Sequence, residues 1–301
     1  MARLTAIVLG SAAGGGYPQW NCRCAACALA WAGDPRISPR SQASLAVSGD
    51  GVSWTLLNAS PDLRAQISAT PELHPRGERR DSPIAAVVLT GAEVDQVAGL
   101  LNLRERQPFE LFASEETLAI LDANPIFDVL APDAVRRRPA APSSPFTLPG
   151  GIEAELFAVP GKVALYMEKE AGGLEAEPGG NVGVELRAAG ARLVFVPGAA
   201  ALDEQVRARI ERADVVLFDG TLFADDEMIR LGVGAKTGRR MGHMPVGGPD
   251  GSLAALAGLT NRRIYIHLNN TNPLLIEGSQ ERNEVVVAGW EVAFDGLRIE
   301  V

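Results

Sequence analysis

The chain has few of the residues that usually carry metal or redox chemistry. Its 301 residues include only three cysteines and three histidines. Three cysteines cannot all pair as disulfides, which excludes a disulfide framework as the main source of stability. The histidines are His74, His243 and His267, so few positions can supply an imidazole ligand.

Long apolar runs and an excess of positive charge are also missing. Runs such as residues 84–89 are far shorter than the roughly 20 residues of a membrane span. The net charge is −9 and the pI about 5.0, so the surface would mostly repel a nucleic acid. We therefore expect a cytoplasmic protein that acts on a small molecule, without membrane or nucleic-acid partners. The sequence leaves open whether it works alone or as a homodimer.

All the cysteines lie within six residues, Cys22-Arg23-Cys24-Ala25-Ala26-Cys27. They follow a strand-like opening at residues 4–9 and a glycine turn at 14–16. Thiols at i, i+2 and i+5 on a tight loop can converge on one tetrahedral ion, which predicts a zinc knuckle that lacks its fourth ligand. The alternative is a set of three reduced, buried thiols without metal.

Strand-like and helical patterns alternate along the rest of the chain, which predicts one α/β domain over residues 1–301. The expected strands are 84–90, 192–196, 215–218 and 263–267, and the expected helices are 93–103, 203–212 and 279–288. Residues 290–294 and 297–301 are expected to form a closing strand pair around an Asp295-Gly296 turn. Residues 131–151 and 170–180 are expected to be surface loops.

Five polar clusters follow predicted strands, at residues 58–62, 93–96, 219–221, 239–243 and 267–273. In open α/β sheets the chemistry gathers beyond the carboxyl ends of the strands, so these clusters are expected to face one cavity. Asn and Asp are also favoured at turns and helix caps for local reasons. The recurrence of the clusters after strands favours the functional interpretation.

Residues 89–100 have the frame of the metallo-β-lactamase signature Thr-His-x-His-x-Asp-His-x-x-Gly-Leu. Gly91, Glu93 and Gln96 replace its histidines, Asp95 is retained, and residues 160–162 resemble its downstream Pro-Gly-His. From about residue 4 to the end, the chain resembles the pyrroloquinoline quinone (PQQ) biosynthesis protein B family, a divergent branch of that superfamily. The segments that carry this resemblance are 10–24, 58–62, 219–221, 232–243 and 266–273.

The resemblance implies a metallo-β-lactamase-like αββα sandwich. It also implies a structural zinc held by Cys22, Cys24, Cys27 and His267. A histidine at the end of a strand can meet a loop that leaves the first strand, which agrees with this assignment. His74 lies among prolines and charged residues and is expected in a surface loop.

The family's role is to make PQQ from a cross-linked glutamate and tyrosine. The resemblance implies iron-dependent hydroxylation of the tyrosine ring or, alternatively, transport of PQQ or its precursor by a soluble carrier. Fe(II) oxygenases use two histidines and one carboxylate. Here Asp95 is expected to be a ligand or base with Glu93 and His243 as partners, and Asp219 as a further ligand. Such an oxygen-rich set should hold iron weakly.

Several other interpretations have to be weighed. The histidine cage of a metallo-β-lactamase hydrolase is missing, and the glycine-rich residues 11–16 lack the helix of a nucleotide-binding loop. His243 is either a ligand, an acid/base group or merely hydrogen-bonded. Gln96 either faces the metal or caps its helix. The expected substrate contacts are Arg239, Arg240, Asn269 and Asn270, although the two arginines equally fit a solvated face.

Overall fold

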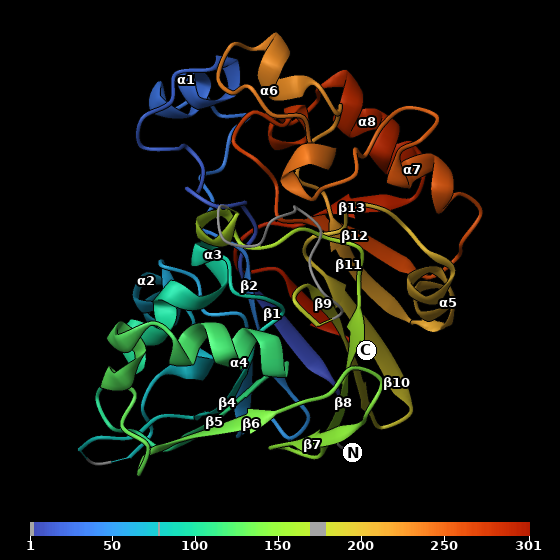
Figure 1. Cartoon of the computed structure of the whole chain (residues 1–301). Helices are drawn as coiled ribbons and strands as arrows, with labels where there is room; N and C mark the ends of the chain where they lie inside the picture. The colour runs from blue at the N-terminus through green and yellow to red at the C-terminus, as the bar shows by residue number, and fades with distance from the viewer. Residues whose placement is uncertain (1–2, 78, 169–178) are drawn as a thin grey trace.

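Two seven-stranded β-sheets pack face to face in the computed structural model, which describes residues 3–77, 79–168 and 179–301 (Figure 1). The first sheet has the strand order β14 (Arg298–Glu300), β1 (Thr5–Gly10), β2 (Ser44–Ser48), β3 (Trp54–Leu57), β4 (Ile84–Val88), β5 (Phe109–Ala113) and β6 (Val135–Pro139). The second has the order β13 (Trp290–Val292), β12 (Arg262–Ile266), β11 (Val215–Asp219), β10 (Ala191–Val196), β9 (Val182–Ala188), β8 (Ile152–Ala158) and β7 (Phe146–Leu148).

Strand β4 shows how the sequence produces these sheets. It pairs in parallel with β3 and β5 and is apolar throughout, as expected for a strand buried on both faces. Its Ala86 and Val88 side chains join the cluster between the sheets, and Val87 between them joins the cluster under the outer helices. Ile84 also joins the outer cluster, because the pairing of β3 with β4 shifts register between Ile84 and Ala86.

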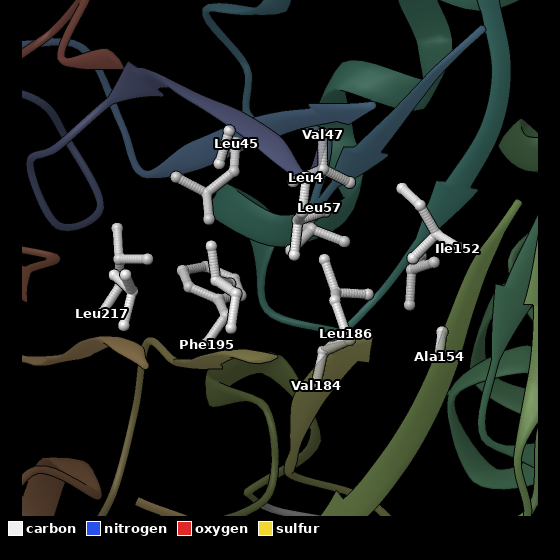
Figure 2. Packing of buried hydrophobic residues seen from close by; sticks show 14 of the residues in the cluster. Leu4, Leu45, Val47, Leu57, Ile152, Ala154, Val184, Leu186, Phe195 and Leu217 are labelled. Atoms are coloured by element: carbon white, nitrogen blue, oxygen red, sulfur yellow. The ribbon is translucent and has the colours of Figure 1, made fainter. Parts of the chain in front are cut away.

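The interior between the sheets is an apolar layer to which both sheets contribute (Figure 2). Leu45, Val47 and Leu57 come from the first sheet and meet Leu186 and Phe195 from the second. All five are fully buried. This layer fixes the two sheets against each other and therefore fixes the loops at their ends.

Helices cover the outer faces of both sheets, which gives the predicted αββα order (Figure 1). The helices α2 (Leu63–Ala69) and α4 (Glu115–Asp122) pack on the first sheet, and α5 (Glu204–Arg212) and α8 (Gln280–Val287) on the second. The four short helices are α1 (Ala25–Trp31), α3 (Val94–Val97), α6 (Glu227–Arg230) and α7 (Ser252–Ala255). No helix in the described ranges is long and apolar enough to cross a membrane.

Most of the expected elements are present, with shifted ends. The helix expected over 93–103 is an α-helix only at Val94–Val97 and continues as a 3₁₀-helix over Ala98–Leu103. The region 131–151 is not entirely loop, because it contains β6 and β7. The other expected loop, 170–180, lies almost wholly outside the described residues.

The expected closing strand pair is wrong. Strand β13 pairs with β12 in the second sheet, whereas β14 pairs with β1 in the first. The Asp295-Gly296 turn therefore carries the chain from one sheet to the other. Asp295 accepts hydrogen bonds from the Ser11 and Ser41 hydroxyls at 2.8 Å each, and Gly296 N donates to Val8 O. These contacts anchor the turn on the first sheet, so a local turn signal did not produce a hairpin.

Candidate metal centres

A cavity of about 550 Å³ opens where the parallel strands β4, β11 and β12 end. Its lining includes Asp95, Lys162, Lys236, His243 and His267. Four of the five polar clusters contribute to this lining, as the rule for open α/β sheets predicts. The cluster at 58–62 does not. Its Asn58 instead exchanges hydrogen bonds with Thr90 at the end of β4.

Two histidines and one aspartate converge at this cavity. The potential ligand atoms of Asp219, His243 and His267 all lie within 4.8 Å of one another. His243 Nδ1 is 2.8 Å from Asp219 Oδ2, and His267 Nε2 is 2.9 Å from Asp95 Oδ2. The two imidazole rings stack with their centroids 5.2 Å apart. We call Asp95, Asp219, His243 and His267 the histidine–aspartate cluster.

The Thr221 hydroxyl holds this cluster together. It donates to Asp219 Oδ1 at 2.6 Å and lies 3.0 Å from His243 Nδ1 and 2.8 Å from His267 Nδ1. Asp219 Oδ2 also accepts a hydrogen bond from Ala199 N at 2.9 Å. The carboxylate is therefore oriented by the loops that follow β10 and β11, and Thr221 is a positioning residue for both imidazoles.

Opposite charges within the cluster oppose the cost of burying it. Burial alone would raise the pKa of Asp95 and of Asp219, but the neighbouring histidines lower the pKa of each carboxyl below its ordinary value. For His267 burial alone would lower the pKa, and the hydrogen bond and charge of Asp95 raise it instead. Both carboxylates are therefore ionised at neutral pH, as ligands of a cation must be.

The backbone at His267 has an uncommon conformation for a residue other than glycine. Its φ is 62°, in the left-handed region. Immediately after it, Leu268 N donates to Ser11 O at 2.9 Å and Leu268 O accepts from Ala13 N at 2.8 Å. The loop after β12 is thus fastened to the segment that leads into the cysteines. A strained backbone held by its surroundings in this way is typical of a functional site.

The three thiols form a second cluster around Asn270. The sulfurs of Cys22, Cys24 and Cys27 lie within 4.8 Å of one another. Asn270 Nδ2 lies 3.1 Å from Cys22 Sγ and 3.4 Å from Cys27 Sγ, and its backbone oxygen is 3.6 Å from Cys24 Sγ. Burial raises the pKa of Cys24 to about 12, so a cation that binds here must displace its proton. We call these four residues the thiol cluster.

The structure does not bring His267 to the thiols. The loops meet as expected, but they pair at Leu268, and the side chain that reaches the sulfurs is that of Asn270. Both ring nitrogens of His267 are engaged elsewhere, by Thr221 and by Asp95. His267 therefore belongs to the cavity.

The structure places the expected catalytic residues in two different surroundings. Asp95 and His243 lie in the histidine–aspartate cluster. Glu93 lines the cavity but accepts hydrogen bonds from Lys162 Nζ at 2.7 Å and from Leu165 N at 3.2 Å. It is paired with a lysine and is not a partner of Asp95, so that expectation is corrected. Gln96 completes a capping box with Glu93, which confirms the helix-cap alternative.

Some of the residues expected to contact the substrate lie at the cavity and others lie away from it. Asn269 lines the cavity, and its amide donates to Thr271 Oγ1 at 2.6 Å. Asn270 belongs to the thiol cluster instead. Arg239 is exposed and donates to Asp250 O, whereas Arg240 lies 3.6 Å from Glu168 beside the cavity. Asn270 and Arg239 are therefore removed from the expected substrate contacts.

The sequence left three residues of this region without a role. Thr221 stood in a recognised segment, but nothing marked its hydroxyl as the link between two histidines. Lys236 also stood in a recognised glycine-rich segment, but without a role, and Glu168 lies just before an acidic stretch and in no recognised segment. Their ion pair joins positions 68 residues apart, so no local pattern could have predicted it. His74 is exposed, as expected.

Comparison with known proteins gives one consistent relationship. Residues 53–268 match the family model of the beta-lactamase superfamily domain. The chain is 54% identical over 299 residues to coenzyme PQQ synthesis protein B of Methylobacterium nodulans, covering 99% of this chain and 100% of that protein. It is also 54% identical over 295 residues to the protein of that name from Ruegeria pomeroyi, covering 97% and 98%. The crystal structure of Zn(2+)-bound PqqB from Methylobacterium extorquens superposes with a TM-score of 0.96 at 53% identity, covering 99% of this chain and 100% of that one.

Proposed function

Because the chain belongs to the coenzyme PQQ synthesis protein B family, within the beta-lactamase superfamily, we propose that it is a metal-dependent hydroxylase of PQQ biosynthesis. Its substrate is the tyrosine-derived ring of a cross-linked glutamate–tyrosine precursor. The observation that carries this proposal is the set of two imidazoles and one carboxylate, His243, His267 and Asp219, at the wall of a cavity. This is the donor set of non-haem Fe(II) oxygenases with open ligand positions.

The residues present fit a ferrous ion better than the sequence indicated. An oxygen-rich site with weak iron binding was expected from Asp95, Glu93 and His243. His267 adds a second imidazole and Glu93 is withdrawn to Lys162, so the donor set becomes richer in nitrogen. Imidazole binds first-row divalent metals well. When bound, the ion would supply the activation of dioxygen.

The net reaction converts an aromatic C–H bond to C–OH. One oxygen atom of dioxygen enters the ring and the other leaves as water. This balance takes two electrons and two protons from an external reductant of the ascorbate class. Asp95, 2.9 Å from His267 Nε2, fixes that ring and is placed to accept a proton. Thr221 orients both imidazoles, and the cavity is large enough for a substrate of two linked amino acids.

The thiol cluster supports a separate, structural zinc. Thiolates are preferred zinc ligands, and a structural site is closed by four donors. Asn270 would supply the fourth donor through its backbone oxygen, which lies 3.6 Å from Cys24 Sγ and 3.9 Å from Cys27 Sγ. A zinc there would link helix α1 to the loop after β12. This link would help to hold the cavity in shape.

The test is oxygen uptake by anaerobically prepared protein mixed with the precursor, ferrous iron and ascorbate. The product mass should rise by one or two oxygen atoms only when iron is present. Asp95→Ala should abolish this gain and leave the zinc content unchanged. The exposed Asp226→Ala serves as the matched control and should turn over normally. Product formation that survives Asp95→Ala would remove Asp95 from the reaction.

The second candidate is a soluble carrier of PQQ or its precursor. The cavity itself favours it, because a chamber of about 550 Å³ can hold such a molecule without transforming it. A carrier would bind the finished quinone and show no turnover with any metal. Oxygen-dependent conversion of the precursor by the iron-loaded protein would exclude a carrier role alone.

A further inference from the structure

Lys162 and Lys236 line the cavity and, together with Arg240 beside it, gather positive charge around the Glu168 carboxylate. We propose that Lys162, Lys236 and Arg240 form a subsite for a carboxylate group of the substrate, and that Glu168 lies in this subsite and competes for it. The inference rests on the proposed function, because it assumes that a carboxylate-rich precursor enters this cavity. Residues outside the histidine–aspartate cluster would then determine which substrate binds.

The geometry is that of a carboxylate shared among three cations. Lys236 Nζ lies 3.3 Å and 3.2 Å from the two Glu168 oxygens. Arg240 Nη2 lies 3.6 Å from Oε2, and Lys162 Nζ lies 3.6 Å from Oε1. Only the Lys236 contact reaches hydrogen-bonding distance, so Arg240 and Lys162 attract the carboxylate mainly through charge.

Charge at this subsite favours a further carboxylate. Among the residues that the structure describes, Lys162, Lys236 and Arg240 carry three positive charges, and their acidic partners Glu168 and Glu93 carry two negative ones. A chain with a net charge of −9 would otherwise repel a polyanionic substrate, as would the aspartates of the cavity. A local cationic wall overcomes this repulsion and selects which end of the substrate it receives.

The contact with Glu168 is suited to exchange. The side chains of Lys236 and Arg240 are 38% and 39% exposed, so an incoming group can reach them. Neither contact is a bidentate, buried pair, which would resist displacement. Lys162 differs, because its 2.7 Å bond to Glu93 holds its ammonium group in the cavity wall. Lys162 therefore acts as the fixed part of the subsite and Lys236 as its adaptable part.

This arrangement also gives the substrate an orientation. An amino-acid carboxylate held at the cationic wall leaves the aromatic ring free to face the histidine–aspartate cluster, which lines the same cavity. Holding one end of a substrate in this way contributes to catalysis by limiting its freedom near the reacting atoms. Converting the carboxylates of the substrate to esters should therefore remove the contribution of the cationic wall to binding.

The test is anaerobic calorimetric titration of the cross-linked precursor and of its methyl ester into four proteins. Lys236→Gln should weaken precursor binding about tenfold, the effect of losing one charge-assisted contact. Glu168→Gln should tighten it about threefold, because the competing carboxylate is gone. Arg239→Gln is the matched control for charge, since Arg239 donates to Asp250 O away from the subsite. This variant should bind the precursor with the same affinity as the unaltered protein. The ester should bind all four alike.

The outcomes separate this inference from the proposed function. Equal precursor affinity in the unaltered protein and Lys236→Gln overturns the subsite, and so does weaker binding by Glu168→Gln. Melting curves identify a variant that fails to fold, in which case Arg240→Gln replaces Lys236→Gln with the same expectation. If the affinities are as expected but the precursor is not converted in the presence of oxygen, the hydroxylase proposal is overturned and the subsite is retained. No precursor binding by the unaltered protein overturns both.

Discussion

The thiol cluster and the histidine–aspartate cluster draw on the same loop but differ in chemistry. His267 and Asn270 follow β12 three residues apart, and one reaches the cavity while the other reaches the cysteines. The thiol cluster offers soft sulfur donors beside helix α1. The histidine–aspartate cluster offers imidazoles and carboxylates at a cavity of about 550 Å³. One loop therefore couples a site suited to structure to a site suited to reaction.

The difference teaches that donor type and surroundings assign a role better than proximity in sequence. Cys22, Cys24 and Asn270 line a separate pocket of about 340 Å³, whereas the histidines share the larger cavity of about 550 Å³ with Lys162 and Lys236. A closed zinc site stabilises a fold, and an open one performs chemistry. A change in one cluster should therefore leave the metal content of the other intact.

The largest effect is expected for Cys24→Ser. Serine cannot replace a thiolate as a zinc ligand, so zinc should be lost and α1 released from the loop after β12. We expect a loss of more than about 4 kcal/mol in the free energy of unfolding, the range in which loss of a metal falls. Calorimetry and metal analysis measure it. Arg23→Gln, in the same loop but exposed, should keep both zinc and stability. A Cys24→Ser protein that melts like the parent contradicts the structural role.

The next effect concerns Asp219→Asn, which removes charge at nearly constant volume. Its carboxylate is fully buried and contacts His243, so ferrous iron should bind more than about 100-fold more weakly and hydroxylation should stop. Zinc content should not change. Asp226→Asn, an exposed aspartate near the same loop, is the control. Iron titration followed by zinc analysis decides, and a simultaneous loss of zinc would mean that the clusters are not independent.

The pH dependence of iron binding should be smaller and has a definite sign. Asp95 raises the pKa of His267 above its ordinary value of 6.5, and a metal can bind that imidazole only after its proton leaves. Iron affinity should therefore rise as the pH increases above about 6.5 and level off above the raised pKa. Asp95→Asn removes the charge that raises the pKa of His267. In this variant the rise in iron affinity should therefore occur at lower pH. A rise at the same pH in both proteins would exclude the Asp95–His267 pair as its origin.

The smallest effect is expected for Gln96→His. A histidine here would bind iron if position 96 faced the ion, but Gln96 Oε1 accepts from Glu93 N at 3.1 Å as part of the helix cap. We expect unchanged iron affinity and a loss of about 1 kcal/mol in stability, typical of a lost cap. Gln96→Glu keeps the cap acceptor and should be nearly as stable as the parent. Tighter iron binding by Gln96→His would place position 96 in the metal site.

The fold was predictable because its signals are local and repeated. The buried strand β4 and the capped helix α5 follow directly from their apolar patterns, and polar residues after strands marked the cavity. The strand pair expected around Asp295 failed because a turn motif does not determine which sheet the next strand joins. That choice depends on packing of the whole sandwich.

The site was only partly predictable. Asp95 was found from a motif and His243 from a polar cluster after a predicted strand, but the structure places His267 in the cavity and Asn270 at the thiols, the reverse of what was expected. His267, whose side chain reaches the cavity, has a left-handed backbone with a φ of 62°, and no sequence pattern predicts this conformation. The Lys236–Glu168 pair was missed for another reason, since its members are 68 residues apart.

The most direct test of two independent clusters is the metal content of His267→Ala after anaerobic loading with zinc and ferrous iron. The assignment of His267 to the cavity predicts that about one zinc per chain remains, because Asn270 and not His267 would complete the thiol cluster, and that iron is lost. Loss of zinc with retention of iron would return His267 to the cysteines and contradict the account.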